Sequence, residues 1–547
     1  MMKNTLKQLD KKRNTRGITL IALVVTIVVL LILAGVTISM LRGENGIIKQ
    51  AQNANEATIV EQEKEAIVVA YSLKKAQRIG SYVTAKDLQD ELIKNGKNVT
   101  VKTSGNNLVI KFNDTNHSYK IDQNGNVEKE ETSNNTDKIY AKLYTDNTLI
   151  LSSTDYTDST RTVSEDYGDI SNEKYYLDLN SKFNDPEINV PKWIDVRGID
   201  GHPALYNKAD DIIIYDEIKP KTLAFWFASY SGKTLDLTNI DTSNAESMKG
   251  TFYNCDGLEQ LDINNFDTSN VTDMSCMFRD CGYTAMTSLT LPESFNTSKV
   301  EKMQEMFMNC GYTAMTSLTL PESFNTSKVE KMQEMFMNCG YTAMTSLTLP
   351  ESFNTSKVTN MSYMFADCGY TAMTSLTLPE SFNTSIVTDM SHMFDGCGSE
   401  KLTSLILPES FNTSNVTCMS GMFNWCGYKA MTSLILPESF NTSKVTNMSH
   451  MFSDCGYTAM TSLTLPESFN TSKVTDMSYM FDGCGRLKLE TIDLGGMSFD
   501  NVTNSYDIFC NTGGNKVYVK DKAAQTFVKA NKSSSWSDNN IIIKTGS

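Results

Sequence analysis

A segment of 29 residues that recurs along the second half of the chain restricts the possible fold more than any other feature of the sequence. The sequence GYTAMTSLTLPESFNTSKVEKMQEMFMNC occupies residues 282–310 and recurs without change over residues 311–339. Shorter, diverged units flank the array at residues 256–281 and at about 485–510. Five further copies of the same length each end in a cysteine: Cys368, Cys397, Cys426, Cys455 and Cys484. Because one such unit cannot bury its own apolar face, we expect neighbouring units to stack into a solenoid with one shared core.

The order of residues within one unit predicts a short strand, a turn and a short helical turn. Leu289 and Leu291 alternate with polar residues as in a strand, and Pro292 ends the strand because it has no N–H to donate. Ser298 followed by Glu301 matches a capping box at the start of a helix. Three apolar residues that follow are expected on the inner side of one helical turn: Met303, Met306 and Phe307.

The remaining strand positions are expected to point outward and to form columns along the solenoid, because successive side chains of a strand face opposite ways. The strand columns, in which two isoleucines replace threonine, comprise Ser288, Thr290, Ser317, Thr319, Ser346, Thr348, Ser375, Thr377, Ile406, Ile435 and Thr464. The glutamate column just after each strand comprises Glu293, Glu322, Glu351, Glu380, Glu409, Glu438 and Glu467. Together these residues predict a broad, flat, weakly polar face for contact with a large partner, without the pocket or acid–base pair that catalysis requires.

Two interpretations of the glutamate column remain open. Neighbouring carboxylates about 5 Å apart repel by only about 1 kcal/mol per pair in water, so solvent alone can tolerate the row. A divalent cation such as Ca²⁺ bridging the row is the other interpretation. In the first interpretation the charge is partly balanced by a lysine column: Lys299, Lys328, Lys357, Lys444 and Lys473. We assign no resident metal or cofactor.

The repeat resembles the leucine-rich repeat of BspA-like bacterial surface proteins, including the FNTSxVTxMSxMFxxC type also found in mycoplasma-type surface lipoproteins. The residues that carry the resemblance in one copy are Phe353, Asn354, Thr355, Ser356, Val358, Met361, Met364, Phe365 and Cys368. The resemblance covers about residues 230–510. It implies a solenoid displayed on the cell surface for adhesion or protein recognition, with an extracellular protein or cell-surface ligand of unknown identity as partner.

An apolar run near the N-terminus predicts a membrane anchor. Ile18–Leu41 contains 24 residues without a charge, which is long enough to cross a hydrocarbon core of roughly 30 Å. Six Lys and Arg residues in 1–17 predict that this leader is cytoplasmic and that the bulk of the chain is extracellular. The run is too long for a cleaved secretory signal. We therefore expect a single-pass protein of the bacterial cell membrane, exposed at the cell surface.

The junction Arg16-Gly17-Ile18-Thr19-Leu20-Ile21 resembles the N-terminal cleavage and methylation motif of type IV prepilins and type II secretion pseudopilins. The resemblance covers roughly residues 1–79 and implies cleavage by a membrane peptidase between Gly17 and Ile18. The family usually has Glu at the fifth position after the cut, where this chain has Ala22. The resemblance implies an alternative function, a minor pilin or pseudopilin-like subunit that carries the repeats as an adhesin and contacts pilus or secretion subunits.

The whole chain is predicted to be an α+β protein with an N-terminal transmembrane helix and several extracellular segments. Within the first extracellular segment we expect a stalk helix over Ile47–Arg78, a helix over Val83–Asn95 and three hairpin-connected strands. The segments are a small pilin-like α/β head with its stalk (42–127), a linker (128–137), a β-rich N-terminal cap (138–230), the leucine-rich repeat solenoid (231–510) and a C-terminal cap (511–547).

Charge and composition restrict the possible functions. The chain carries a net charge of −15, which repels phosphate backbones, so nucleic-acid binding is not expected. No Ser/His/Asp, Cys/His or metal-ligand arrangement stands out among the four His and 12 Cys, so we expect no enzyme activity. Most cysteines recur once per unit and are expected to be buried free thiols. Cys276 and Cys418 fall outside that register and are predicted to be the more reactive ones.

Overall fold

The computed structural model describes residues 47–77, 83–104, 107–113, 115, 117–122, 125–130, 138–175, 177, 189–199 and 202–544. The chain divides into two compact units, Met1–Asn134 and Asn135–Ser547. The predicted leader, the predicted cleavage site between Gly17 and Ile18 and the apolar run Ile18–Leu41 lie outside the described residues. No helix in the described part of the chain is both long enough and apolar enough to cross a membrane.

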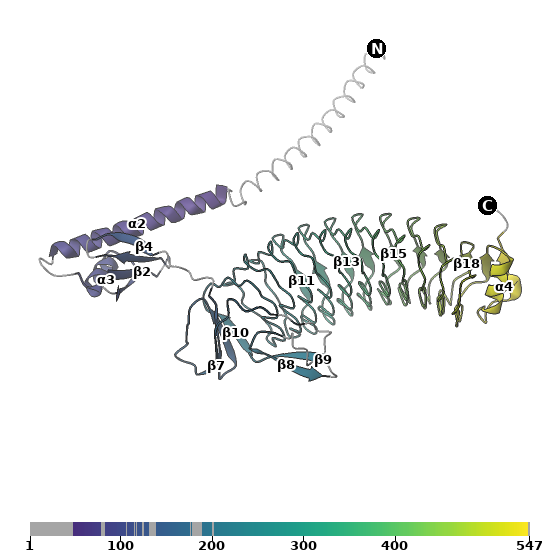
Figure 1. Ribbon diagram of the computed structural model, residues 1–547, viewed down its shortest axis with the longest axis horizontal. Coiled ribbons are helices and arrows are strands. Elements are labelled where there is room, and N and C mark those ends of the chain that lie inside the picture. The colour runs from purple at the N-terminus through teal and green to yellow at the C-terminus, as the bar shows by residue number, and fades with distance from the viewer. Residues whose placement is uncertain are drawn as a thin grey trace, which may run out of the picture. The chain divides into compact units, whose positions relative to one another are not determined.

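The described residues of the first unit form two helices and one antiparallel sheet (Figure 1). Helix α2 (Ile47–Gln77) confirms the helix predicted over Ile47–Arg78, and α3 (Ala85–Lys94) confirms the predicted short helix. Thr84 caps α3, because its hydroxyl accepts a hydrogen bond from the Asp87 N–H while the Asp87 carboxylate accepts one from the Thr84 N–H. The strands follow one another in the sheet as β1 (Val99–Ser104), β2 (Asn107–Phe112), β3 (Ser118–Ile121) and β4 (Val127–Glu130).

Strand β4 corrects the prediction of three strands followed by a linker from residue 128. It pairs antiparallel with β3, with Val127 opposite Ile121, so the charged residues 128–130 belong to the sheet. A strand at the edge of a sheet often carries charged side chains, and the charged composition of β4 led to its prediction as part of a linker. The rest of the predicted linker, residues 131–137, lies outside the described residues.

A buried carboxylate joins α2 to this sheet. Glu63 accepts hydrogen bonds from the hydroxyls of Thr115 (2.6 Å) and Tyr119 (2.7 Å), and its other contact is Nδ1 of His117 at 2.6 Å. Burial would raise the pKa of Glu63, but these hydrogen bonds outweigh burial and the pKa is lowered. The periodicity of α2 shows which of its residues face inward, but it does not show that the charged Glu63 finds partners on β3 and in the segment just before it.

The second unit begins with a small sheet and a hairpin that precede the solenoid. The sheet has the strand order β10-β6-β5-β7, formed by β5 (Tyr140–Tyr144), β6 (Thr148–Ser152), β7 (Val163–Asp169) and β10 (Asp211–Ile214). Strands β8 (Ile194–Ile199) and β9 (His202–Asn207) form the hairpin. Trp193 is fully buried and its indole N–H donates to the carbonyl of Trp226 at 2.9 Å. This sheet therefore shares its core with the first turn of the solenoid.

The repeats form a β-solenoid in which each unit adds one short parallel strand (Figure 1). The strands are β11 (Ser288–Thr290), β12 (Ser317–Thr319), β13 (Ser346–Thr348), β14 (Ser375–Thr377), β15 (Ser404–Ile406), β16 (Ser433–Ile435), β17 (Ser462–Thr464) and β18 (Thr491–Leu494). Paired strands are in register, so Leu289 lies opposite Leu318 and Leu434 opposite Leu463. A second line of parallel bridges joins Lys302, Lys331 and the equivalent residue of every later unit.

Equivalent apolar residues of successive units stack into columns inside the solenoid, as the repeat predicts. Phe307, Phe336 and Phe365 are fully buried and stack with ring centroids 5.5 Å apart. The Met, Val and Cys columns beside them are also fully buried, including Met361 and Cys368. One continuous hydrophobic core therefore extends through the array, and no unit has a core of its own.

The segment after Val300 is not helical, so the predicted helical turn and its capping box are wrong. The N–H groups of Glu305 and Phe307 donate to carbonyls of the next unit, Gln333 at 3.0 Å and Met335 at 2.9 Å. Glu305 adopts a left-handed backbone conformation (φ 59°), as does Asn309 (φ 54°). These left-handed residues turn alternate peptide groups toward the neighbouring unit, where a helix would have kept its hydrogen bonds within the segment.

Near Ser298 a different motif replaces the capping box. The Asn296 side-chain oxygen accepts a hydrogen bond from the Ser298 N–H at 2.9 Å. The buried Thr297 hydroxyl donates to the Asn325 carbonyl of the next unit at 2.8 Å. The same two bonds recur along the array, so each Asn-Thr-Ser triplet both forms a turn and links successive units.

Stacking extends beyond both predicted limits of the solenoid, residues 231 and 510. Parallel bridges begin with Ile218–Ile240 and Thr222–Ser247, inside the segment predicted as a cap. At the other end, β19 (Lys516–Val519) and β20 (Ile541–Ile543) continue the parallel sheet after β18. Helix α4 (Lys522–Ala530) and a 3₁₀ turn, η1 (Asp538–Asn540), connect those two strands, and α4 lies at the C-terminal end of the array (Figure 1). Ala524 and Val528 of α4 are buried in the common core.

Candidate binding face

The predicted strand columns lie on the outer surface of the parallel sheet. Each strand from β11 to β15 buries its central leucine and exposes the residue on either side. In-register pairing places equivalent residues next to each other, so Ile406 lies opposite Ile435 in the ladder between β15 and β16. Ile406 is 76% exposed and Ile435 is 65% exposed. The sheet thus presents short polar side chains with one apolar pair among them.

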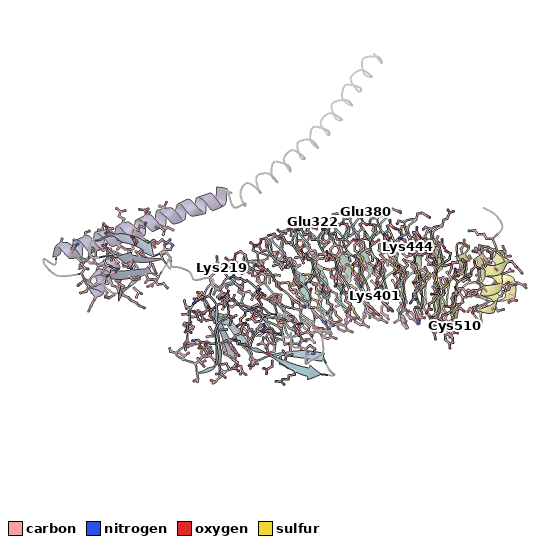
Figure 2. The ribbon with its side chains drawn as sticks, viewed as in Figure 1. Lys219, Glu322, Glu380, Lys401, Lys444 and Cys510 are labelled. Carbon is pink, nitrogen blue, oxygen red and sulfur yellow. The ribbon has the colours of Figure 1, made fainter. Side chains whose placement is uncertain are left out.

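The glutamate column lies on the edge that follows these strands, and every glutamate in it is exposed. In the view of Figure 2, Glu322 and Glu380 lie along one edge of the solenoid, whereas Lys401 and Cys510 lie toward the opposite edge. Among the described residues none of the seven glutamates forms an ion pair, and the lysine column does not pair with them either. Lys299 donates instead to the Asn270 side chain at 2.7 Å.

The calcium interpretation finds no geometric support in the described residues, where no group of three or more His, Cys, Asp or Glu side chains could hold a metal ion. A single row places each carboxylate between two neighbours on a line, whereas Ca²⁺ needs six to eight oxygens around one point. Solvent therefore remains the environment of the column. The role of these residues and of the strand columns in binding stays a prediction, as does processing at Gly17 and Ile18.

Aromatic rings form a second, unpredicted feature of the outer surface. Tyr283, Tyr312 and Tyr341 stack with ring centroids 4.6 Å apart, one ring from each unit. Tyr370 continues the stack, and the next unit has Ser399 at the equivalent position. The indole of Trp425, 38% exposed, stacks on Tyr428, the tyrosine of the following unit, at 4.4 Å. The tyrosine column could have been predicted from the Gly-Tyr-Thr-Ala sequence, which recurs at the same position of successive units.

Carboxylates of adjacent units lie near one another at several places that sequence reasoning missed, and at two of them an aspartate pKa rises to about 6. Burial and the neighbouring carboxylate of Asp395 raise the pKa of Asp367 to about 6. Burial and the carboxylate of Asp482 likewise raise the pKa of Asp454 to about 6. In each case the later unit carries the sequence Asp-Gly-Cys in place of the Asp-Cys ending, so two aspartates occupy neighbouring positions. The sequence signal is this one-residue shift of the aspartate between successive units.

The predicted reactivity of Cys276 is wrong, because its thiol is buried. Burial and the nearby Glu305 carboxylate raise the pKa of Cys276 well above its ordinary value. Cys418 is half-buried and its pKa is raised by burial as well. Cys510 is also half-buried, whereas the cysteines that recur once per unit are fully buried and free. Thiolate chemistry is therefore suppressed along the array.

A recess of about 320 Å³ lies where the glutamate column ends. Its wall includes Glu467, Asp493 and Lys544, and Gly495-Gly496 occupies the place of the Pro-Glu-Ser corner of earlier units. The Lys544 ammonium lies 2.8 Å from the Asp493 carboxylate, so part of the charge in the recess is neutralised within the chain. This arrangement offers a mixed polar surface without a free nucleophile.

Comparison with known families identifies the stacked region. A family model described as "Mycoplasma protein of unknown function, DUF285" matches four overlapping segments of the chain: 221–341, 313–424, 370–458 and 399–521. Together these segments extend from residue 221 to residue 521, which is more than half of the chain. No curated protein and no solved structure matches the chain.

Proposed function

The chain belongs to the DUF285 family of repeat proteins, and from this membership we propose that it is a membrane-anchored surface protein whose solenoid recognises other proteins. The proposal assigns it no catalytic role and no cofactor. Its partner is an extracellular protein or a cell-surface ligand, and adhesion is the expected outcome of that contact.

The observation that carries the proposal is the outer face of the parallel strands β11 to β18, which repeats from unit to unit. In-register strands repeat the same short side chains from unit to unit, which gives a long, flat surface suited to a large partner. The exposed pair Ile406 and Ile435 interrupts this polar surface with apolar area. Burying apolar area in an interface contributes favourable binding free energy, so this pair is the expected centre of contact.

Attachment assays with variants of that pair test the recognition part of the proposal. Cells that express the full chain are compared with cells that express I406D/I435D, which keeps the buried leucines and places charge on the outer face. We expect attachment to host cells or matrix proteins to fall about tenfold or more. The control L487D changes an equally exposed leucine, 60% exposed, outside the strand columns and should attach as the parent does. Equal attachment by all three would contradict the role of the face.

Anchoring is proposed from the uncharged run Ile18–Leu41 and the basic leader before it. N-terminal sequencing of the membrane-extracted protein tests both anchoring and processing. A first residue at Ile18 supports cleavage after Gly17, a start at Met1 supports an uncut anchor, and a start beyond Leu41 contradicts anchoring by this segment.

A second candidate function is that of a minor pilin or pseudopilin-like subunit. The order in the first unit, a long helix α2 followed by a small antiparallel sheet, favours it, together with the residues around Gly17. Ala22 disfavours it, because the family uses a glutamate there for assembly. Immunogold labelling separates the candidates: signal along filaments supports the second, and diffuse signal over the envelope supports the first.

A further inference from the structure

Two columns of opposite charge lie on either side of one corner of the solenoid. In each full unit a glutamate follows the strand, and six residues later the chain carries a position that is lysine in five of the seven units. Both side chains are exposed, as in Glu351 and Lys357. The residues between them on the outside are short, such as Ser352 and Asn354 in the same unit. The glutamate and lysine side chains therefore project beyond the short residues that lie between them at the corner.

Within one chain these columns do not neutralise each other. No ion pair between them is present in the described residues, and the lysines that have a polar partner contact asparagine: Lys299 donates to Asn270, and Lys444 donates to Asn415 at 2.5 Å. The acidic column is thus a row of like charges in solvent. A row of cations at the same spacing would remove the repulsion along it.

The spacing identifies the partner. Neighbouring parallel strands lie about 4.8 Å apart, so each column presents one charge at that interval. An α-helix repeats every turn at about 5.4 Å, and an extended strand presents side chains on one face about 6.6 Å apart, so neither stays in step over several units. Another stack of parallel rungs does stay in step. The lysine column of a second copy of this chain has both the required charge and the required interval.

We propose that two copies of the chain associate side by side through this corner, with the glutamate column of each copy facing the lysine column of the other. The inference deepens the proposed function, because it names a second copy as one partner of the surface protein. Five units supply matched positions without any shift between the copies: Glu293 and Lys299, Glu322 and Lys328, Glu351 and Lys357, Glu438 and Lys444, and Glu467 and Lys473.

The arrangement of the columns also fixes the direction of pairing. A two-fold axis parallel to the solenoid exchanges the two flanks of the corner, so glutamate faces lysine on both sides. A two-fold axis perpendicular to the solenoid leaves the flanks unexchanged and would set glutamate against glutamate. The copies must therefore run in the same direction, with their N-terminal ends together.

Sedimentation velocity of the full chain in detergent micelles, at low and at high salt, tests the pairing. We expect a self-associating species at low salt that dissociates at high salt, because exposed charges are screened beyond about 10 Å at 0.1 M ionic strength. Variant A, E322K/E351K/E438K, and variant B, K328E/K357E/K444E, should each associate about tenfold more weakly than the parent. A mixture of A and B should associate as the parent does.

The matched control combines all six substitutions in one chain. This variant exchanges glutamate and lysine at three levels of the two columns, which restores charge complementarity, so it should self-associate like the parent. Thermal melting of every variant, followed by circular dichroism, checks that the fold is kept. A parent that stays monomeric at low salt would overturn the inference, and so would association that neither A nor B weakens. Loss of association in the six-substitution control would overturn it as well.

These outcomes are separable from those of the proposed function. A monomeric chain that is still found on the cell surface and still mediates attachment refutes the pairing alone. A chain that pairs as described but is absent from the surface of intact cells refutes the proposed function and leaves the pairing intact.

Discussion

At the scale of single residues, the stacked fold places unusual demands on a few positions in each unit. Glycine follows each cysteine that ends a full 29-residue unit, with φ near 55°, and at Gly369 an added Cβ would lie 2.6 Å from the Cβ of Met373. Two aspartates with raised pKa values, Asp367 and Asp454, lie beside further carboxylates. The first feature is a tight turn within one unit, and the second arises because similar positions of successive units are brought close together.

Replacing Gly369 with alanine should destabilise the solenoid by about 2–4 kcal/mol, because the left-handed backbone and the contact with Met373 both oppose a Cβ atom. Thermal denaturation followed by circular dichroism measures the effect. S346A, an exposed strand position, is the control and should melt with the parent. Equal melting of G369A would show that the turn tolerates a side chain.

Replacing Asp367 with asparagine should stabilise the solenoid at pH 7. The pKa of Asp367 in the folded chain is about 6, which lies above its ordinary value near 3.9. The free energy that protonated Asp367 contributes to folding is therefore fully present below about pH 4 and is lost as the pH rises through about 6. Removing the charge should recover about 1 kcal/mol at pH 7, after allowance for solvent screening, and almost nothing at pH 4.

Melting temperatures of D367N and the parent across this pH range measure that difference. The control E351Q removes an exposed carboxylate from the glutamate column and should show no such pH dependence. A D367N variant that melts below the parent at pH 7 would contradict the placement of Asp367 beside Asp395.

At the scale of elements, the sequence predicted the strands, the inward columns and the outward columns, because period-two alternation in TSLTL and exact repetition leave few other solutions. The helical turn over Met303–Phe307 was predicted wrongly for a physical reason. Apolar residues three and four apart face one side both in a helix and in this series of turns. What separates the two is the left-handed backbone at residues such as Glu305 and Tyr363, whose side chains give no sign of it.

The unpredicted contacts between units have the same origin. The Asp367–Asp395 neighbours and the Tyr283–Tyr312 stack depend on which units are adjacent and on how far each side chain leans toward the next. A single unit therefore contains too little information to predict them. In the first unit, Glu63 was likewise unpredictable, because its partners lie more than fifty residues away in the sequence.

Removal of one complete unit should leave the fold intact. Deleting residues 311–339 joins Cys310 to Gly340, which restores the junction found in every copy and keeps each column in register. We expect a folded protein with the parent's circular dichroism spectrum and a slightly lower melting temperature, because one stacking interface is lost. Deleting residues 311–325, about half a unit, should abolish cooperative melting. Equal behaviour of the two deletions would contradict stacking in register.

At the scale of the whole molecule, the chain contains a stacked array of the DUF285 family, which we propose is displayed outside the cell. The solenoid buries ten of its 12 cysteines, leaves Cys418 and Cys510 half-buried, and exposes Thr348 at the centre of the strand columns. A new thiol at that position would therefore be distinguishable from the native ones by its accessibility and its ordinary reactivity.

Labelling with a membrane-impermeant maleimide, on intact cells that carry the T348C variant or the parent, tests whether the solenoid is displayed outside the cell with its strand columns facing outward. We expect strong labelling of T348C on intact cells and only weak labelling of the parent. Labelling of T348C that appears only after the cells are lysed would contradict display at the surface, and failure to label even in the lysed but folded protein would contradict the outward face.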